Sequence, residues 1–170
     1  AGAVARGPRC LEDYGWCMEK LVLDLTAMGL STCWLGGTFR RSAFARAVEL
    51  GPDEVQPAVT PVGFPAGRKG TVDILASAVA GSRGRRRWED LFLFDRDSAG
   101  PWAECLEAVR LSPSAANGQP WRVVQATAPA VFHFYSVRSA GRSLQPVDIG
   151  IAMCHFELAC RELGLAGRWR

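Results

Sequence analysis

The segment with the most polar and turn-forming groups runs from Leu111 to Arg122 and reads Leu-Ser-Pro-Ser-Ala-Ala-Asn-Gly-Gln-Pro-Trp-Arg. Pro113 prevents a preceding helix from continuing, and Ser114 and Asn117 can present a hydroxyl and an amide. Irregular backbone of this kind also leaves N–H groups that can bind a ligand. The chemistry that suits these groups is the orientation of a flat or polar ligand. The same residues would also serve an ordinary capped turn, so both interpretations stay open.

A second segment, from Gly29 to Gly37, reads Gly-Leu-Ser-Thr-Cys-Trp-Leu-Gly-Gly. Its last two glycines would let the backbone approach a flat ring closely, or would simply make a tight turn. Trp34 on its own is more typical of a hydrophobic core. Cys33 carries a thiol beside this segment, and we expect it to be packed rather than reactive.

Positive charge is concentrated at Arg85, Arg86 and Arg87, with a second pair at Arg40 and Arg41. Guanidinium groups bind phosphate well, but an arginine run is more often a solvated surface. No side chain of the sequence is predicted to act as catalytic acid, base or nucleophile.

The 170 residues, 48% of them hydrophobic, are enough for one domain with a buried core, which we place at residues 1–170. A formal net charge of +3 is too small to predict binding to nucleic acid. No apolar stretch approaches the roughly 20 residues of a membrane helix, so no membrane partner is expected. The absence of a methionine at the start predicts that an N-terminal part is missing.

The six cysteines are interpreted as reduced thiols of a cytoplasmic protein, because no signal peptide precedes them and a chain of this size needs no disulfides. No pair has Cys-x-x-Cys spacing, and His133 and His155 are far apart in the sequence, so no metal site is predicted.

The hydrophobic pattern predicts an α+β layered domain, with a mixed or antiparallel sheet and helices packed on it, because helices and strands do not alternate regularly. Helices are expected at Asp13 to Met28, Ser42 to Leu50 with Ser42 as N-cap, Trp102 to Leu111 and Val147 to Leu163. A strand is expected at Val55 to Phe64, and Pro57 and Pro61 within it predict that it lies at a sheet edge or is interrupted. Further strands are expected at Trp121 to Ala126 and at Val131 to Val137, with an exposed excursion or mobile flap over Pro65 to Arg87.

The first and last long helices share a design. With a shift of 135 positions, Gly15, Met18, Leu23, Gly29, Leu30 and Trp34 fall on Gly150, Met153, Leu158, Gly164, Leu165 and Trp169. Amphipathic helices that end in Gly-Leu are common, so chance and a duplicated half with pseudo-twofold symmetry remain equal alternatives.

The segment at Leu111 to Arg122 resembles the Pro-Ser-x-x-Asn-x-Gln-Pro-Trp signature of the FMN-dependent nitroreductase family. The segment at Gly29 to Gly37 is similar to that family's Gly-Leu-Gly-Thr-Cys-Trp-x-Gly segment, which also follows a long helix. Weaker similarities occur at Val59 to Pro65 and Arg85 to Phe92. The two signatures occur here in the reverse of the usual order, and the usual N-terminal Arg-x-Ser-x-Arg phosphate-binding segment is absent. The chain therefore resembles a divergent branch of the family.

The resemblance implies a nitroreductase-like fold that binds FMN and passes hydride from NADH or NADPH to a nitro, quinone or related small acceptor. It implies that the cofactor contacts are Pro113, Ser114, Ala115, Asn117, Trp34, Leu35, Gly36 and Gly37 at the ring, and Arg85, Arg86 and Arg87 at the phosphate. Family members usually build each flavin site between two subunits, which predicts a homodimer. We slightly favour a monomer that imitates the dimer, because it would explain both the helix repeat and the motif order. The alternative is a non-catalytic flavin-binding or interaction protein of the same fold.

Overall fold

The structure is a computed structural model of the chain, and it describes residues 2–37, 39–65, 84–126, 130–137 and 143–170. The helices are α1 (Cys10–Ala27), α2 (Arg41–Ala47), α4 (Trp88–Leu91), α5 (Ala103–Leu111) and α6 (Gln145–Glu162), with 3-10 turns η1 (Asp97–Trp102) and η2 (Ala115–Asn117). The strands are β1 (Val4–Ala5), β2 (Ser31–Thr32), β3 (Glu54–Val55), β4 (Val62–Gly63), β5 (Trp121–Gln125) and β6 (Phe132–Ser136).

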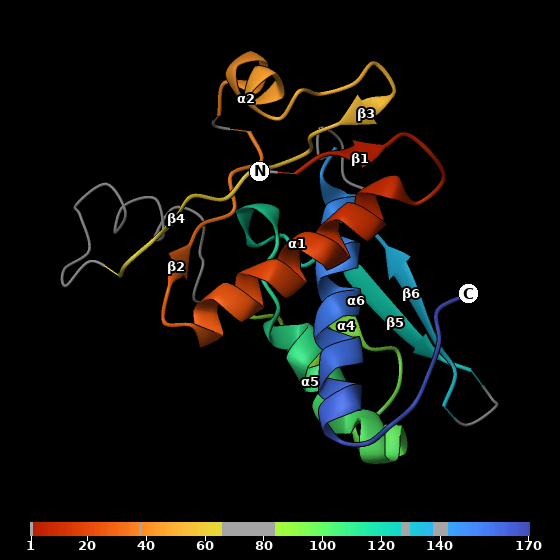
Figure 1. Cartoon of the computed structure of the whole chain (residues 1–170). Coiled ribbons are helices and arrows are strands. Elements are labelled where there is room, and N and C mark those ends of the chain that lie inside the picture. Colours follow the sequence, from red (N-terminus) through yellow and green to blue (C-terminus); the bar gives the residue numbers. More distant parts are fainter. Residues whose placement is uncertain (1, 38, 66–83, 127–129, 138–142) are drawn as a thin grey trace.

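The strands of the described residues form small antiparallel pairs: β1 with β3, β2 with β4, and β5 with β6. The α+β class is therefore confirmed, but the sheets are two-stranded ribbons rather than one broad layer. In the longest ribbon, Trp121 pairs with Ser136 and Gln125 pairs with Phe132. An isolated parallel bridge joins Phe92 to Val123. Figure 1 shows this ribbon beside α6, with the other two ribbons near α1.

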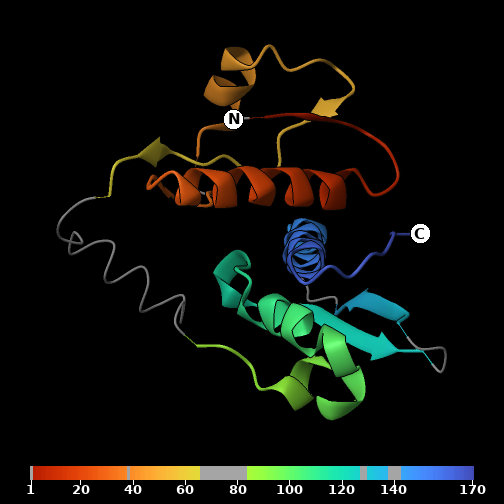
Figure 2. The same cartoon turned by 60° about the horizontal axis from the view of Figure 1, so that its bottom comes forward.

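The centre of the molecule is the crossing of α1 and α6, which Figure 2 shows as successive layers with α5 and the β5–β6 ribbon on the far side of α6. A Cβ added at Gly15 would overlap the backbone carbonyl of Val147, and one added at Gly150 would overlap the backbone carbonyl of Glu12. Glycine is needed at both positions because the two helix backbones approach so closely. The crossing fixes where both helices present their side chains.

The contacts at this crossing are reciprocal under the sequence repeat. Gly15 lies against Val147, and Gly150 lies against Glu12. The two glycines are 135 positions apart, and so are Glu12 and Val147, so a shift of 135 positions converts one contact into the other. The first and last residues of α1 and α6 are also 135 positions apart. The sequence repeat thus coincides with equal helix lengths and a shared contact pattern.

The two helices also end in the same way. Gly29 and Gly164 have φ values of 78° and 69°, in the left-handed region that glycine adopts without strain. The next residue closes each end, because the N–H of Leu30 donates to Leu25 O and the N–H of Leu165 donates to Cys160 O. This is the hydrogen-bond pattern of the Schellman motif, and it occurs at equivalent positions of the two helices.

Two hydrophobic clusters flank α6. One lies among α4, α5, β5 and α6 and is built on Trp88, Leu91, Phe92, Ala99, Leu106, Val109, Trp121, Val123, Ile149 and Ala152. The other lies between α1 and α6 and is built on Tyr14, Met18, Ala58, Val147 and Ile151. The hydroxyl of Tyr14 donates to the carbonyl of Ala58, which attaches the segment after β3 to α1. Both long helices are therefore anchored on their buried faces.

One local expectation needs correction and another is confirmed. Ser42 is not the N-cap of α2, because that helix begins at Arg41 after Arg40, which makes no side-chain cap. The segment from Val55 to Phe64 is interrupted, as expected: its ends form β3 and β4, and Leu35 bridges to Val59 between them. Pro57 and Pro61 lack the N–H that a continuous ladder requires.

An exposed excursion was predicted at Pro65 to Arg87. Residues 66–83 of this segment lie outside the described part of the chain. Among the helices that the structure describes, none combines the length and apolar character needed to cross a membrane.

Candidate functional site

The two segments selected from the sequence line one cavity of about 130 Å³. Trp34 and Gly36 come from the segment after α1, and Pro113 to Ala116 come from the loop after α5. The rest of the lining comes from Ala58 and from one end of α6, at Leu144, Val147, Asp148 and Ile151. Both predicted ring-contact loops therefore meet within one chain.

Gly36 lies against the side chain of Leu144, where a Cβ would overlap the leucine Cδ1. Its neighbour Gly37 has open space at that position. Leu35 is held by two backbone hydrogen bonds to Val59, of 2.9 and 3.0 Å. Within the described residues, the N–H of Gly36 has no hydrogen-bond partner, so it remains available beside the cavity.

Trp34 is held in the cavity wall by a buried carboxylate. Its indole Nε1 donates to Glu19 Oε2 at 2.8 Å, and Glu19 is only 1% exposed. The other oxygen of Glu19 lies 2.8 Å from His155 Nε2 on α6. Because both carboxylate oxygens have hydrogen-bond partners, the buried group is satisfied and the indole orientation is fixed.

The loop between α5 and β5, residues 112–120, is called the Pro-Ser loop. It is attached to α6 through Asp148, which is 3% exposed. The N–H of Ala115 donates to Asp148 Oδ1 at 2.8 Å, and the N–H of Gln119 donates to Ser114 Oγ at 2.9 Å. Ala116 and Asn117 both have a φ of 49°, in the left-handed region that non-glycine residues rarely adopt. Backbone strain of this kind is often found where a loop is shaped for binding.

Asn117 is not among the residues that line the cavity. Its amide nitrogen donates to Gly84 O at 2.7 Å, and its amide oxygen accepts from Arg85 Nη1 at 3.3 Å. Arg85 also donates through Nε to Leu111 O at 3.1 Å. Asn117 and Arg85 thus join the Pro-Ser loop to the segment that begins at Gly84.

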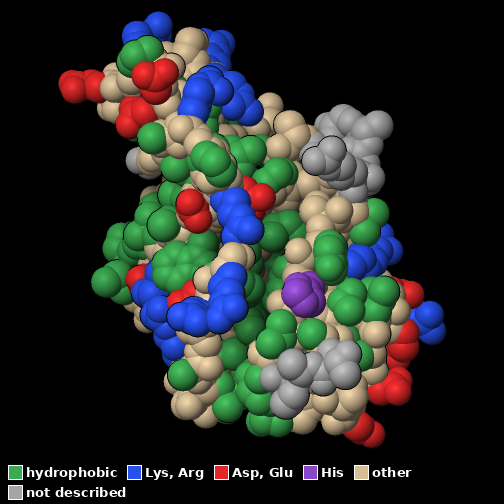
Figure 3. All heavy atoms as spheres, turned by 90° about the vertical axis from the view of Figure 1, so that its right-hand side faces the viewer, with side chains coloured by type: hydrophobic (Ala, Val, Ile, Leu, Met, Phe, Trp, Pro, Cys, Tyr) green, Lys and Arg blue, Asp and Glu red, His purple; other side chains and the backbone are tan. Residues whose placement is uncertain are grey.

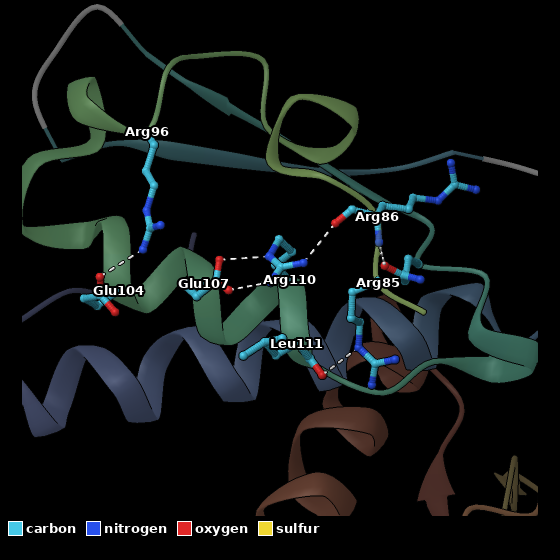
Figure 4. Close-up of polar contacts among 8 residues, drawn as sticks. Arg85, Arg86, Arg96, Glu104, Glu107, Arg110 and Leu111 are labelled. Atoms are coloured by element: carbon cyan, nitrogen blue, oxygen red, sulfur yellow. Dashed lines mark hydrogen bonds and ion pairs between the residues drawn. The ribbon is translucent and has the colours of Figure 1, made fainter. Parts of the chain in front are cut away.

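The three predicted phosphate-binding arginines do not act as one group. Figure 4 shows the side chains of Arg85 and Arg86 pointing away from each other. The N–H of Arg86 donates to Gln119 Oε1, whereas its side chain is exposed. Arg87 forms an exposed ion pair of 3.6 Å with Asp90. None of the three lines the cavity, and their contact with a phosphate stays a prediction.

Arg110 braces this region from α5. It pairs with Glu107 at 2.6 Å and donates to the carbonyl of Arg86 at 3.1 Å, as Figure 4 shows. The hydrogen bond from Arg110 lowers the pKa of Glu107 below its usual value. Burial, and then the charge of Arg86, lower the pKa of Arg122.

Cys33 is exposed, so the expectation of a packed thiol beside the ring segment was wrong. Cys17 is exposed as well, whereas Cys105, Cys154 and Cys160 are buried. Burial raises the pKa of both Cys154 and Cys160 to about 12.

The cysteines should therefore separate by reactivity. At pH 8 the buried thiols stay protonated and inaccessible, and a thiol reacts as its thiolate. Brief treatment of the native protein with iodoacetamide should modify Cys17 and Cys33 and spare the three buried cysteines, as read by peptide mass spectrometry. Labelling in urea supplies the control in which all six react. Early labelling of Cys154 in the native protein would contradict the burial.

The comparisons with known proteins place this site in a family. The family model described as "Putative TM nitroreductase" matches residues 3–160. The chain belongs to that family. The model covers both cavity-lining segments and nearly the whole of α6, so the motif order of this chain is the order that its own family model accommodates.

A solved structure supports the assignment. It is described as a putative nitroreductase from Thermotoga maritima, is 28% identical in sequence and superposes with a TM-score of 0.65. The similarity covers 94% of this chain but 59% of the Thermotoga protein, so the chain spans little more than half of that length. No curated protein matches the chain.

Sequence reasoning missed the part of the nitroreductase-family cavity that comes from α6 and from Ala58. Asp148 and Leu144 contact the two loops, although they lie far from both in the sequence. A glycine inside a helix was the available signal, because Gly150 marks where α6 approaches another backbone. That signal locates the helix crossing but does not identify the side chains beside it.

Proposed function

We propose that this chain is a flavin-dependent oxidoreductase that binds FMN at the cavity and passes hydride from NADH or NADPH to a small nitro, quinone or related acceptor. The observation that carries the proposal is the meeting of the Trp34 to Gly37 segment and the Pro113 to Ala116 loop around one cavity. Membership of a nitroreductase family supports the oxidoreductase class.

The residues at the cavity fit one edge of a flat ring. The lining supplies apolar surface from Trp34, Val147 and Ile151 and a backbone N–H at Gly36. The volume of about 130 Å³ is below the about 300 Å³ at which small-molecule pockets usually begin. The cavity therefore suits a part of the isoalloxazine ring, and the phosphate would lie outside it.

FMN, when bound, would supply the hydride chemistry, because its ring accepts a hydride and returns it to an acceptor. The chain's own residues then bind and orient. Gly36 offers a backbone donor, Trp34 offers a fixed wall, and the Ser114 hydroxyl can turn its hydrogen toward a ligand while it accepts from Gln119. Asp148 is a positioning residue, because its carboxylate holds the Ala115 N–H.

The same proposal includes a single chain that imitates both halves of a dimer. The equal helix bounds, the reciprocal glycine contacts and the two Gly-Leu ends support equivalent central helices. The two ring segments line one cavity within a single chain. In a site shared between subunits, the two segments would instead meet across the subunit interface. Gel filtration with light scattering should then give a mass near 18.4 kDa for this chain.

The proposal is tested by flavin uptake and reduction. Purified protein should bind added FMN, seen as quenching of flavin fluorescence, and the bound flavin should bleach under anaerobic NADH or NADPH. Its yellow colour should return when a quinone or nitro compound is added. Protein that takes up no FMN refutes the proposal. Protein that binds FMN and stays yellow supports the alternative, a flavin-binding protein without catalysis.

Two substitutions locate the ring within this test. Gly36→Val should weaken FMN binding by about tenfold, since the new side chain overlaps that of Leu144 and both residues line the cavity. Asn117→Ala should weaken it less, because it removes the brace to Gly84 rather than a lining group. Gly37→Ala is the matched control, with open space at its Cβ position. Equal FMN affinity in all three variants would refute the loop assignment.

A further inference from the structure

A second and larger cavity lies under α2. It has a volume of about 350 Å³, within the range of small-molecule sites. Its lining comes from the end of β1, from α2 and from β3 with the residues around it: Arg6, Arg41, Ser42, Ala45, Leu50, Glu54, Val55 and Gln56. None of these residues lines the smaller cavity between Trp34 and the Pro113 to Ala116 loop, which is called the ring cavity below.

Helix α2 covers this cavity without filling it, because none of its residues is buried. Its side-chain attachments to the body of the protein come from Arg41, which donates to Gln56 O and Gly36 O, each at 3.2 Å. The Arg41 guanidinium also lies 5.3 Å from the ring of Phe39. The space beneath the helix is therefore open, and an arginine stands at its edge.

The charged groups of this cavity favour an anion. Within the described residues, the guanidinium of Arg6 has no hydrogen bond or ion pair, and Arg41 stands beside the same space. Glu54 offsets only one of these two positive charges, and its Oε2 accepts the N–H of Gly51 at 2.9 Å. Figure 3 shows basic side chains next to acidic ones at the upper end of the molecule, at the height that α2 occupies in Figure 1. Two guanidinium groups and a hydroxyl suit the oxygens of a phosphate.

The remaining lining is apolar. Ala45, Leu50 and Val55 line the cavity from α2, the turn after it and β3. An inorganic anion would leave this surface without a partner, whereas a molecule with a flat apolar body and a phosphate would cover it. A nucleotide has this combination.

The cavity also adjoins the ring cavity. Gln56 lines one and Ala58 lines the other, and two residues of chain span at most about 7 Å. Arg41 connects them directly, because it borders the larger cavity and holds the carbonyl of Gly36 in the smaller one. A ligand that engages Arg41 would therefore act on the position of the Gly36 backbone.

We propose that the cavity under α2 binds the phosphate-bearing adenosine end of a nucleotide, with Arg6 and Arg41 on the phosphate and Ala45, Leu50 and Val55 against the base. The lining of this site is separate from that of the proposed flavin cavity, so nucleotide binding can be measured on protein without flavin. If the proposed reaction also holds, the ligand is the adenosine end of the reducing coenzyme.

The test is calorimetric titration of the protein, without flavin, with three probes at one salt concentration: adenosine 2′,5′-bisphosphate, adenosine 5′-monophosphate and inorganic phosphate. Both nucleotides should bind more tightly than phosphate. If the bisphosphate binds more tightly than the monophosphate, the site recognises the 2′-phosphate and prefers NADPH. If the two nucleotides bind equally tightly, NADH is as good a ligand as NADPH. Phosphate that binds as tightly as the nucleotides, or no saturable binding of any probe, overturns the proposal.

Two variants fix the location. Arg6→Ala should weaken nucleotide binding by about tenfold, whereas Arg46→Ala, which removes the same charge from α2 outside the cavity lining, should change it by less than about twofold. Ala45→Leu should also weaken binding, because leucine suits a helix and its larger side chain occupies part of the space that the ligand needs. Circular dichroism and thermal melting establish that each variant is folded. Equal losses in Arg6→Ala and Arg46→Ala would overturn the site, because they would reflect charge alone.

Discussion

Gly150→Ala is expected to lower the free energy of unfolding by about 1–3 kcal/mol. Alanine is the better helix former by about 1 kcal/mol, so an unopposed substitution within α6 would stabilise the protein. Its Cβ, however, would overlap the backbone carbonyl of Glu12 and lie within 3.0 Å of the Trp16 nitrogen. Backbone atoms cannot rotate away, so α1 and α6 must separate and loosen the packing on both. Urea unfolding followed by circular dichroism measures the loss.

The control is Gly7→Ala, where the added Cβ meets nothing within 4 Å. Gly15→Ala should resemble Gly150→Ala, because it acts on the same crossing from the other helix. The double variant should lose less than the two single losses combined, since helices already separated by one methyl group accommodate the second more easily. Strict additivity, or a stabilised Gly150→Ala protein, would contradict the close crossing.

The elements predicted best were those with a strong apolar period and a clear end. Helices α1 and α6 end where Gly29 and Gly164 take left-handed backbone, close to the predicted ends. Both helices begin two or three residues before the predicted starts. Arg9 and Leu144, which precede them, make no side-chain cap, so the usual N-cap signal was missing, although Pro146 marks the start of α6.

The strand prediction was weaker where prolines interrupt the chain. The prolines at 57 and 61 indicated an interrupted strand, but not that its ends pair with two different partners. Those partners, β1 and β2, have two residues each, which is too short for an alternating pattern to be read from sequence.

The candidate site was predicted in its local parts and missed in its long-range parts. The Trp-x-Gly and Pro-Ser segments could be selected because each carries its turn residues within a few positions. The contribution of Asp148 and Leu144 depends on how α6 lies against both segments, which no local pattern records. The arginine run shows the same limit, because the bond from Arg85 to Asn117 depends on where the Pro-Ser loop folds back.

The two long helices share one further feature, a glutamate that orients tryptophan side chains. Glu19 on α1 accepts from Trp34 and lies beside His155 of α6. Glu157 on α6 accepts from Trp169 and from Trp16 of α1. Each glutamate thus accepts a hydrogen bond from a tryptophan that follows its own helix. Each also contacts a ring nitrogen of a residue on the other helix. Of these, only Trp34 lines the ring cavity, so the two halves share an architecture but differ in the site.

This difference makes Glu19→Ala an informative substitution. It leaves the Trp34 indole and the His155 ring without their buried partner, and the loss of hydrogen bonds to a charged group should cost about 2–4 kcal/mol of unfolding free energy. Because Trp34 lines the cavity, we also expect FMN affinity to fall by about tenfold. Urea unfolding measures the first effect, and quenching of flavin fluorescence measures the second.

Glu157→Ala is the matched control. It removes a carboxylate that accepts hydrogen bonds from two indoles, neither of which lines the cavity. It should lower stability and leave FMN affinity within about twofold of the original protein, since a bond remote from the site acts on folding alone. Glu19→Gln should restore most of the FMN affinity, because its side-chain oxygen can still accept from Trp34 Nε1. If Glu19→Ala and Glu157→Ala weaken FMN binding equally, Glu19 contributes only to stability. The cavity wall would then not depend on how Trp34 is held.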